Sequence, residues 1–99
     1  MARVLLRSLA EAEVTEATLW YAARSLQTAR RFVSLVDATI TRIAADPSSF
    51  PMVGLQLRRA IVPHFPYAIY FIVLPDVVAV IGVIHTRRHP RRWQRRDGG

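Results

Sequence analysis

Residues suited to acid–base or phosphate chemistry gather near the C-terminal end of this sequence. Residues 85–96 contain two histidines, one tryptophan and six arginines. Two further arginines, Arg58 and Arg59, are adjacent in the middle of the chain. Histidine titrates near neutral pH, and the arginine guanidinium is a planar fork of donors that suits phosphates and carboxylates. These residue types indicate either proton transfer at a phosphate or the binding of an anionic partner.

The first interpretation is ribonuclease chemistry. Attack by a 2'-hydroxyl needs a group that takes its proton, a cation that holds the developing phosphate charge and an acid for the leaving oxygen. His85 or His89 is the candidate for proton transfer, and Arg58 and Arg88 are candidates for the phosphate. A histidine such as His85 is more often a structural residue that closes a strand. No catalytic residue is therefore assigned outright.

The second interpretation is binding without chemistry, which requires only exposed arginines and an aromatic anchor. Trp93 can stack on a base or fill a pocket of the partner. It can also pack back on the protein, anchored by Pro90. The candidate target-binding residues are Arg58, Arg59, Arg87, Arg88, Arg91, Arg92 and Trp93.

Composition narrows the class of protein. A chain of 99 residues has the size of one domain. It has no cysteine, which excludes disulfides and thiolate chemistry and fits a reducing cytoplasm. We predict no metal and no cofactor, because three histidines alone make a weak metal site. From residue 58 to 99, eight arginines stand against two acids, a balance of +6, which indicates an anionic partner.

Neither secretion nor a membrane span is predicted. The apolar run near the start holds three residues, too few for a signal peptide. Residues 67–84 have the length of a span, but Pro75-Asp76 interrupts them, and their aromatic and β-branched content favours two buried strands. We therefore expect a cytoplasmic protein with no membrane partner.

A strand followed by a helix is predicted at the start of the chain. Residues 4–6 are an apolar run of strand length. Ser8 and Glu11 then match the S-x-x-E capping box, in which a serine side chain caps a helix. The helix is expected from about residue 9 to 24, with apolar residues at helical spacing.

A second amphipathic helix follows after a very short connection. Apolar residues recur at spacings of three and four from Ala29 through Phe32 to Ile43. Asp46-Pro47 ends this pattern, because proline disfavours helical geometry in the residue before it. Two such helices joined closely predict an antiparallel helical hairpin.

Strands are predicted in the second half, after a loop over residues 46–56. The candidates are residues 57–62, 67–74 and 77–85. The element order β-α-α-β-β-β predicts an α+β fold whose helical hairpin packs on one face of a largely antiparallel four-stranded sheet. The arginine-rich end should meet the opposite face. We expect one domain over residues 1–96 and a disordered end over 97–99.

Several short motifs, in this order and spacing, resemble the ParE/RelE toxin superfamily and in particular its ParE-type members. The match extends over about residues 3 to 96. It consists of a Trp-Tyr pair late in the first helix, an Ile-x-x-x-Pro exit from the second, paired arginines before a strand, a Phe-Pro-Tyr turn and a last strand ending in His-x-x-Arg-x-Pro-x-x-Trp. These positions are Trp20, Tyr21, Ile43, Pro47, Arg58, Arg59, Phe65, Pro66, Tyr67, His85, Arg88, Pro90 and Trp93.

The resemblance implies the toxin of a bacterial type II toxin–antitoxin system, neutralised by a cognate antitoxin. ParE-like members are associated with inhibition of DNA gyrase, and RelE-like members cleave mRNA on the ribosome. RelE-like toxins typically use a tyrosine or comparable group near the C-terminus and several lysines. This sequence has no tyrosine after Tyr70 and no lysine. We therefore favour a gyrase inhibitor that acts by binding over a ribosome-dependent mRNA endonuclease. A third class, a nucleic-acid-binding module without toxicity, fits the charge alone.

An acidic antitoxin segment that folds on contact is the expected partner, because the chain carries a net charge of +7. The candidate antitoxin-binding residues are Trp20, Tyr21 and Arg31. Trp20 and Tyr21 are also suited to a place in the core.

Overall fold

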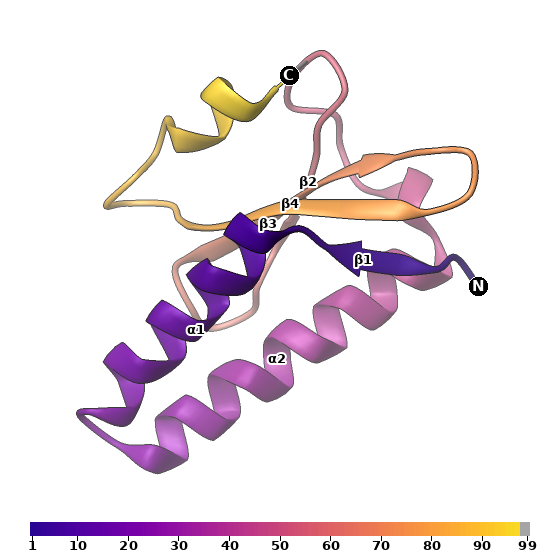
Figure 1. Cartoon of the computed structure of the whole chain (residues 1–99). Helices are drawn as coiled ribbons and strands as arrows, with labels where there is room; N and C mark the ends of the chain where they lie inside the picture. Colours follow the sequence, from indigo (N-terminus) through magenta and orange to yellow (C-terminus); the bar gives the residue numbers. More distant parts are fainter. Residues whose placement is uncertain (98–99) are drawn as a thin grey trace.

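The computed structural model describes residues 1–97 and has two layers, a helical hairpin and a four-stranded sheet (Figure 1). The predicted element order β-α-α-β-β-β is confirmed, with boundaries no more than three residues from those expected. A short 3₁₀ helix precedes the second half of the chain and another ends it. In chain order the elements are β1 (Val4–Leu6), α1 (Ser8–Ala22), α2 (Leu26–Ala45), the first 3₁₀ helix (Pro47–Ser49), β2 (Arg58–Ile61), β3 (Tyr67–Val73), β4 (Val78–His85) and the C-terminal 3₁₀ helix (Arg92–Arg96).

The sheet has the strand order β1-β4-β3-β2. β3 pairs antiparallel with both β2 and β4, and β1 pairs parallel with β4. The sheet is therefore largely antiparallel, as predicted, and the helical hairpin is the crossover between β1 and the other strands. One β-bulge interrupts the β3–β4 ladder, because Tyr70 pairs with Gly82 and Phe71 with Val80, which leaves Ile81 unpaired.

The helices begin by different means. The N-cap of α2 is Ser25, whose Oγ accepts a hydrogen bond of 3.2 Å from the Thr28 backbone. The predicted capping box at Ser8 is wrong. Ser8 is the first residue of α1 and the N-cap is Arg7, which makes no side-chain cap. The reason is that the Arg7 N–H still donates to the Val80 carbonyl of β4, at 2.9 Å, so the helix starts directly from the strand ladder.

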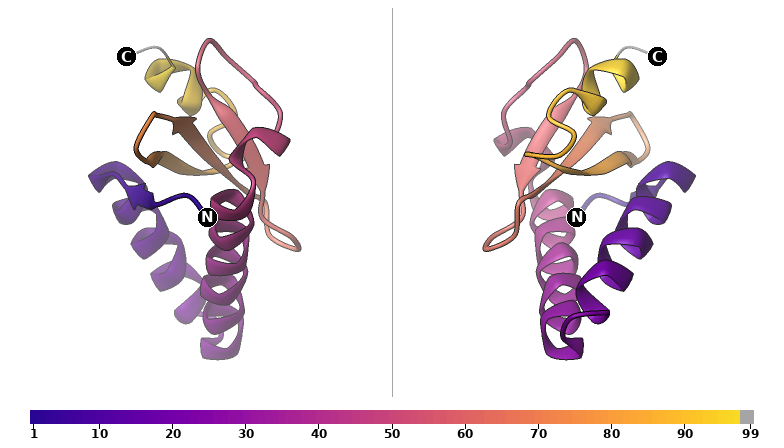
Figure 2. Two further views of the ribbon diagram at one scale, coloured as in Figure 1. Left: turned by 90° about the vertical axis from the view of Figure 1, so that its right-hand side faces the viewer. Right: turned by 90° about the vertical axis from the view of Figure 1, so that its left-hand side faces the viewer.

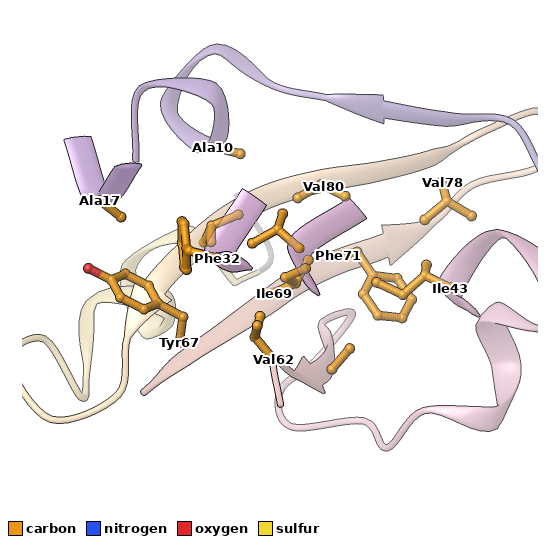
Figure 3. Close-up of a cluster of buried hydrophobic side chains, with 13 residues drawn as sticks. Ala10, Ala17, Phe32, Ile43, Val62, Tyr67, Ile69, Phe71, Val78 and Val80 are labelled. Atoms are coloured by element: carbon orange, nitrogen blue, oxygen red, sulfur yellow. The ribbon is translucent and has the colours of Figure 1, made fainter. Parts of the chain in front are cut away.

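Apolar side chains bury both faces of the sheet. On the helix side, Phe32 and Ile43 of α2 pack against Ile69 and Phe71 of β3 (Figure 3). On the other side, a second cluster centres on Leu57, Tyr70, Ala79, Ile81 and Ile84. The C-terminal 3₁₀ helix lies over that second face, opposite α1 and α2 (Figure 2). The expected arrangement, with the arginine-rich end on the face away from the helices, is observed.

Residues 67–84 form the β3–β4 hairpin rather than a span. Within residues 1–97, no helix is long and apolar enough to cross a membrane. The predicted disorder of residues 97–99 does not hold at Asp97, whose carboxylate accepts hydrogen bonds from the backbone of Leu55 and Gln56. Residues 98 and 99 lie outside the described residues.

Candidate functional site

The C-terminal segment, residues 86–97, is anchored at two points, one on the sheet and one on the loop before β2. The Trp93 ring stacks on Tyr70, with centroids 5.7 Å apart and planes 11° from parallel. The Asp97 carboxylate accepts hydrogen bonds from Leu55 N at 2.7 Å and Gln56 N at 3.1 Å, and these lower the pKa of Asp97. A Cβ at Gly54 would overlap this carboxylate, so only glycine leaves room for it. Of the two roles considered for Trp93, the stacking on Tyr70 corresponds to packing back on the protein.

A third anchor is Glu13 of α1, which sequence reasoning missed. Its carboxylate is buried and accepts hydrogen bonds from Val83 N at 3.0 Å, Arg96 Nη1 at 2.9 Å and Arg92 Nη1 at 3.3 Å. Arg96 Nη1 also donates to the Ile81 carbonyl at 3.0 Å. β1 ends at Leu6, whereas its neighbour β4 continues to His85, so the last part of β4 has no strand beside it on this edge. Glu13 and Arg96 hydrogen-bond the backbone groups of β4 that are left there without a strand partner.

A signal for Glu13 was present in the sequence. It stands three residues after Ala10 and four before Ala17, both of which are buried on the inward stripe of α1. A carboxylate on an apolar stripe needs a partner of opposite charge, because burial of an unpaired charge is costly. That position predicts an arginine or lysine opposite Glu13, but the spacing along the helix does not identify the residue.

His85 lies at the end of β4 with its imidazole engaged. Nδ1 accepts hydrogen bonds from the backbone N–H groups of Arg87 and Arg88, at 3.1 and 3.0 Å. The lone pair is therefore on Nδ1 and the proton of the neutral ring is on Nε2. Burial lowers the pKa of His85, and the Arg88 charge lowers it further. His85 is neutral near pH 7 and has its proton-accepting nitrogen occupied.

Arg88 bridges β3 and α1. Its Nη2 donates to the Tyr67 hydroxyl at 3.0 Å, and its guanidinium carbon lies 5.5 Å from the Trp20 ring centre. Burial raises the pKa of Tyr67, with Arg88 opposing that effect. A cleft of about 20 Å³ lies here, lined in part by His85 and Glu16, and has room for a water molecule.

Arg58 and Arg59 lie on opposite faces of β2. Arg58 Nη1 donates to the backbone carbonyls of Phe50 and Ser48, at 2.6 and 3.2 Å, and holds the loop before β2. Arg59 pairs with Tyr70, and its buried Nε has no hydrogen-bond partner among residues 1–97. Burial raises the pKa of Tyr70, and the Arg59 guanidinium opposes that effect.

Arg58, Arg59 and His85 do not lie together on one face of the sheet. Arg58 pairs with Phe71, whereas His85 pairs with Tyr67, four residues away along β3. At ~3.4 Å per residue this separates the two positions by ~14 Å along the strand. Alternation of side chains also turns Arg58 and Arg59 to different faces. The nuclease candidates His85, Arg58 and Arg88 are therefore not brought together as one set; only His85 and Arg88 are neighbours.

The six arginines of the C-terminal segment fall into two sets that differ in their contacts. Arg88, Arg92 and Arg96 make the inward contacts described above. Arg87, Arg91 and Arg95 are exposed, and their side chains make no hydrogen bond within residues 1–97. The target-binding candidates thus divide into arginines engaged by the fold (Arg58, Arg88 and Arg92), a partly engaged Arg59, and two open to solvent (Arg87 and Arg91).

The antitoxin-binding candidates differ in accessibility. Tyr21 is half-buried in an aromatic cluster with Phe32 and Phe65, at centroid distances of 5.3 and 5.0 Å. Trp20 is 41% exposed, and Arg24 stacks on its ring at 3.5 Å. Arg31 is exposed on α2. Within residues 1–97, no three acidic or histidine side chains are grouped so as to hold a metal ion.

Comparison with known proteins places this chain. The family model described as "ParE toxin of type II toxin-antitoxin system, parDE" matches residues 4–90. Among solved structures, a chain described as "Chromosomal ParDE TA system from P. aeruginosa" superposes with a TM-score of 0.76 at 12% identity, and the match covers 86% of this chain and 96% of that one. No curated protein matches in sequence. The chain, a two-layer α+β domain with its basic segment folded back on the sheet, belongs to the ParE toxin family of type II toxin–antitoxin systems.

Proposed function

We propose that this toxin acts in the bacterial cytoplasm by binding DNA gyrase, inhibits DNA replication in that way, and is neutralised by an acidic antitoxin. The observation that carries the proposal is the state of His85. Two backbone N–H groups occupy the nitrogen that a general base would use. The exposed Arg87 and Arg91 are left to engage a target by charge.

Purified toxin added to gyrase and relaxed plasmid tests the proposal. We expect loss of supercoiling and accumulation of cleaved DNA, unchanged by His85→Gln. Arg87→Ala with Arg91→Ala should weaken inhibition more at low salt than at high salt, because high salt already screens exposed arginine contacts. Toxin that leaves gyrase active but cuts mRNA on ribosomes, with the cutting lost in His85→Gln, would establish the RelE-like alternative instead.

The hairpin offers a site for the antitoxin. An open groove of about 500 Å³ runs between α1 and α2, lined by Thr18, Ala22, Leu26, Ala29 and Val33 among others. Leu26 is 65% exposed. The net charge of +7 and this apolar groove fit an acidic, amphipathic helix. We expect Leu26→Asp to weaken capture of the toxin by its antitoxin in a pull-down while leaving the thermal melt of the toxin unchanged.

A further inference from the structure

We infer that Arg87, Arg91 and Arg95 form a ridge that binds the phosphate backbone of duplex DNA. The three side chains stand at every fourth position of the C-terminal segment and are exposed. Their neighbours Arg92 and Arg96 turn inward to Glu13, and Arg88 turns to Tyr67. The segment thus holds arginines whose guanidinium groups are hydrogen-bonded to the fold, including the exposed Arg88, and arginines whose guanidinium groups are exposed without such a bond.

The charge on the ridge is not compensated within residues 1–97. Glu13 is committed to Arg92 and Arg96, and the Asp97 carboxylate is committed to the backbone of Leu55 and Gln56. Several exposed arginines on one short segment favour a ligand that carries several anions, and each guanidinium can hold a phosphate through two donors.

Two observations favour duplex DNA over other polyanions. Proteins that bind single strands stack bases on aromatic side chains, but Trp93, the one aromatic residue of the segment, already stacks on Tyr70. Acidic protein partners bury apolar side chains beside their charges, but between residues 75 and 97 no large apolar side chain is exposed. Backbone contacts on a duplex need only the cations of this segment, and the exposed apolar side chain beside Arg95 is Leu9 of α1, outside the segment.

Glu13 is the positioning residue of this ridge. By holding Arg92 and Arg96 against β4 from the opposite side, it fixes the turn in which Arg91 and Arg95 point outward. The backbone that carries Arg91 and Arg95 is therefore held in place before the ligand arrives, which lowers the entropy lost on binding.

Fluorescence anisotropy with a labelled duplex of arbitrary sequence tests the inference, using the full-length toxin separated from its antitoxin. Three phosphate contacts predict that log K falls with log salt concentration at a slope of about −2.7. The variant Arg87→Gln/Arg91→Gln/Arg95→Gln should lose this binding and its salt dependence. The matched variant Arg3→Gln/Arg30→Gln/Arg42→Gln removes the same charge from exposed positions elsewhere and should retain both.

Three results would overturn the ridge. They are an equal loss in both triple variants, tighter binding to single-stranded DNA or RNA of the same length, and tighter binding to polyglutamate. Circular dichroism must show that both variants keep the fold. The inference rests on the proposed function in one respect, since the duplex is the DNA that gyrase holds. The two fail separately: duplex binding without gyrase inhibition removes only the proposed function, and inhibition that survives loss of the ridge removes only its role in that function.

Discussion

At the scale of single residues, Glu13 joins α1, β4 and the C-terminal segment. Glu13→Ala leaves the Val83 N–H without an acceptor and removes the ion pairs to Arg92 and Arg96. We expect the free energy of unfolding to fall by about 2 to 4 kcal/mol, a range reduced because Arg92 is partly exposed. Glu13→Gln should cost less, since its amide oxygen can still accept from Val83. Urea denaturation measures both.

The matched control for Glu13 is Glu16→Ala, at an exposed position one turn further along α1. It should change stability by no more than about 0.5 kcal/mol. If both alanine variants were equally stable, the Glu13 contacts would contribute nothing to the fold.

Gly82 makes room for Arg96. A Cβ at Gly82 would lie 2.7 Å from Arg96 Nη1 and 3.0 Å from Ile84 Cδ1. We expect Gly82→Ala to displace the arginine from Glu13 and to speed hydrogen exchange over residues 92–96. In an Arg96→Ala background the same substitution should cost less stability. Additive costs in this double-mutant cycle would show that Gly82 and Arg96 act independently.

His85 makes stability depend on pH. Its folded-state pKa is lowered, first by burial, so between that pKa and its ordinary value near 6.5 the unfolded chain binds more protons than the folded chain. Its contribution is fully present above pH ~6.5 and is lost as pH falls towards the folded pKa. Denaturation midpoints at pH 5, 6, 7 and 8 should therefore fall on acidification, and His85→Gln should flatten the profile. If the profile of His85→Gln had the same slope as that of the unmodified protein, His85 would not be the group whose pKa is lowered on folding.

At the scale of elements, α2 is the helix that places large side chains in the helix-side core, where α1 places two alanines. Phe32 is fully buried and touches Tyr67 and Phe65, at centroid distances of 5.2 Å each. We expect Phe32→Ala to lower the free energy of unfolding by about 3 to 5 kcal/mol, typical of truncating a buried aromatic residue. Leu26→Ala, at a 65% exposed position of the same helix, is the control and should leave the thermal melt nearly unchanged.

At the scale of the whole molecule, the positive charge governs how the protein behaves alone. The net charge is +7, and most of it lies in the second half of the chain. We expect expression of the toxin by itself to arrest growth or to yield little soluble protein, and co-expression with its antitoxin to yield a soluble complex with an acidic partner. Normal growth with abundant, soluble, partner-free toxin would argue against the proposed function.

The sequence by itself determined the elements and the fold class, because periodicity and turn residues are local properties. The stripe from Ala29 to Ile43 predicts α2, and Asp46-Pro47 predicts its end. The capping box was the local exception. The sequence pattern at Ser8 and Glu11 is correct for a cap, but pairing of the Arg7 backbone with β4 decides where the helix starts.

Only the tertiary structure decided which of the basic residues are open to a partner. Arg58 and His85 are separated by the antiparallel register of β3, and the bulge at Ile81 sets which groups of β4 face Glu13 and Arg96. Glu13 and Arg96 are 83 residues apart in sequence. Their contact depends on how α1 packs beside the edge of β4, and no local pattern records that packing. Arginines that are indistinguishable in the sequence therefore divide into hydrogen-bonded and open sets only through the packing of α1 against the edge of β4.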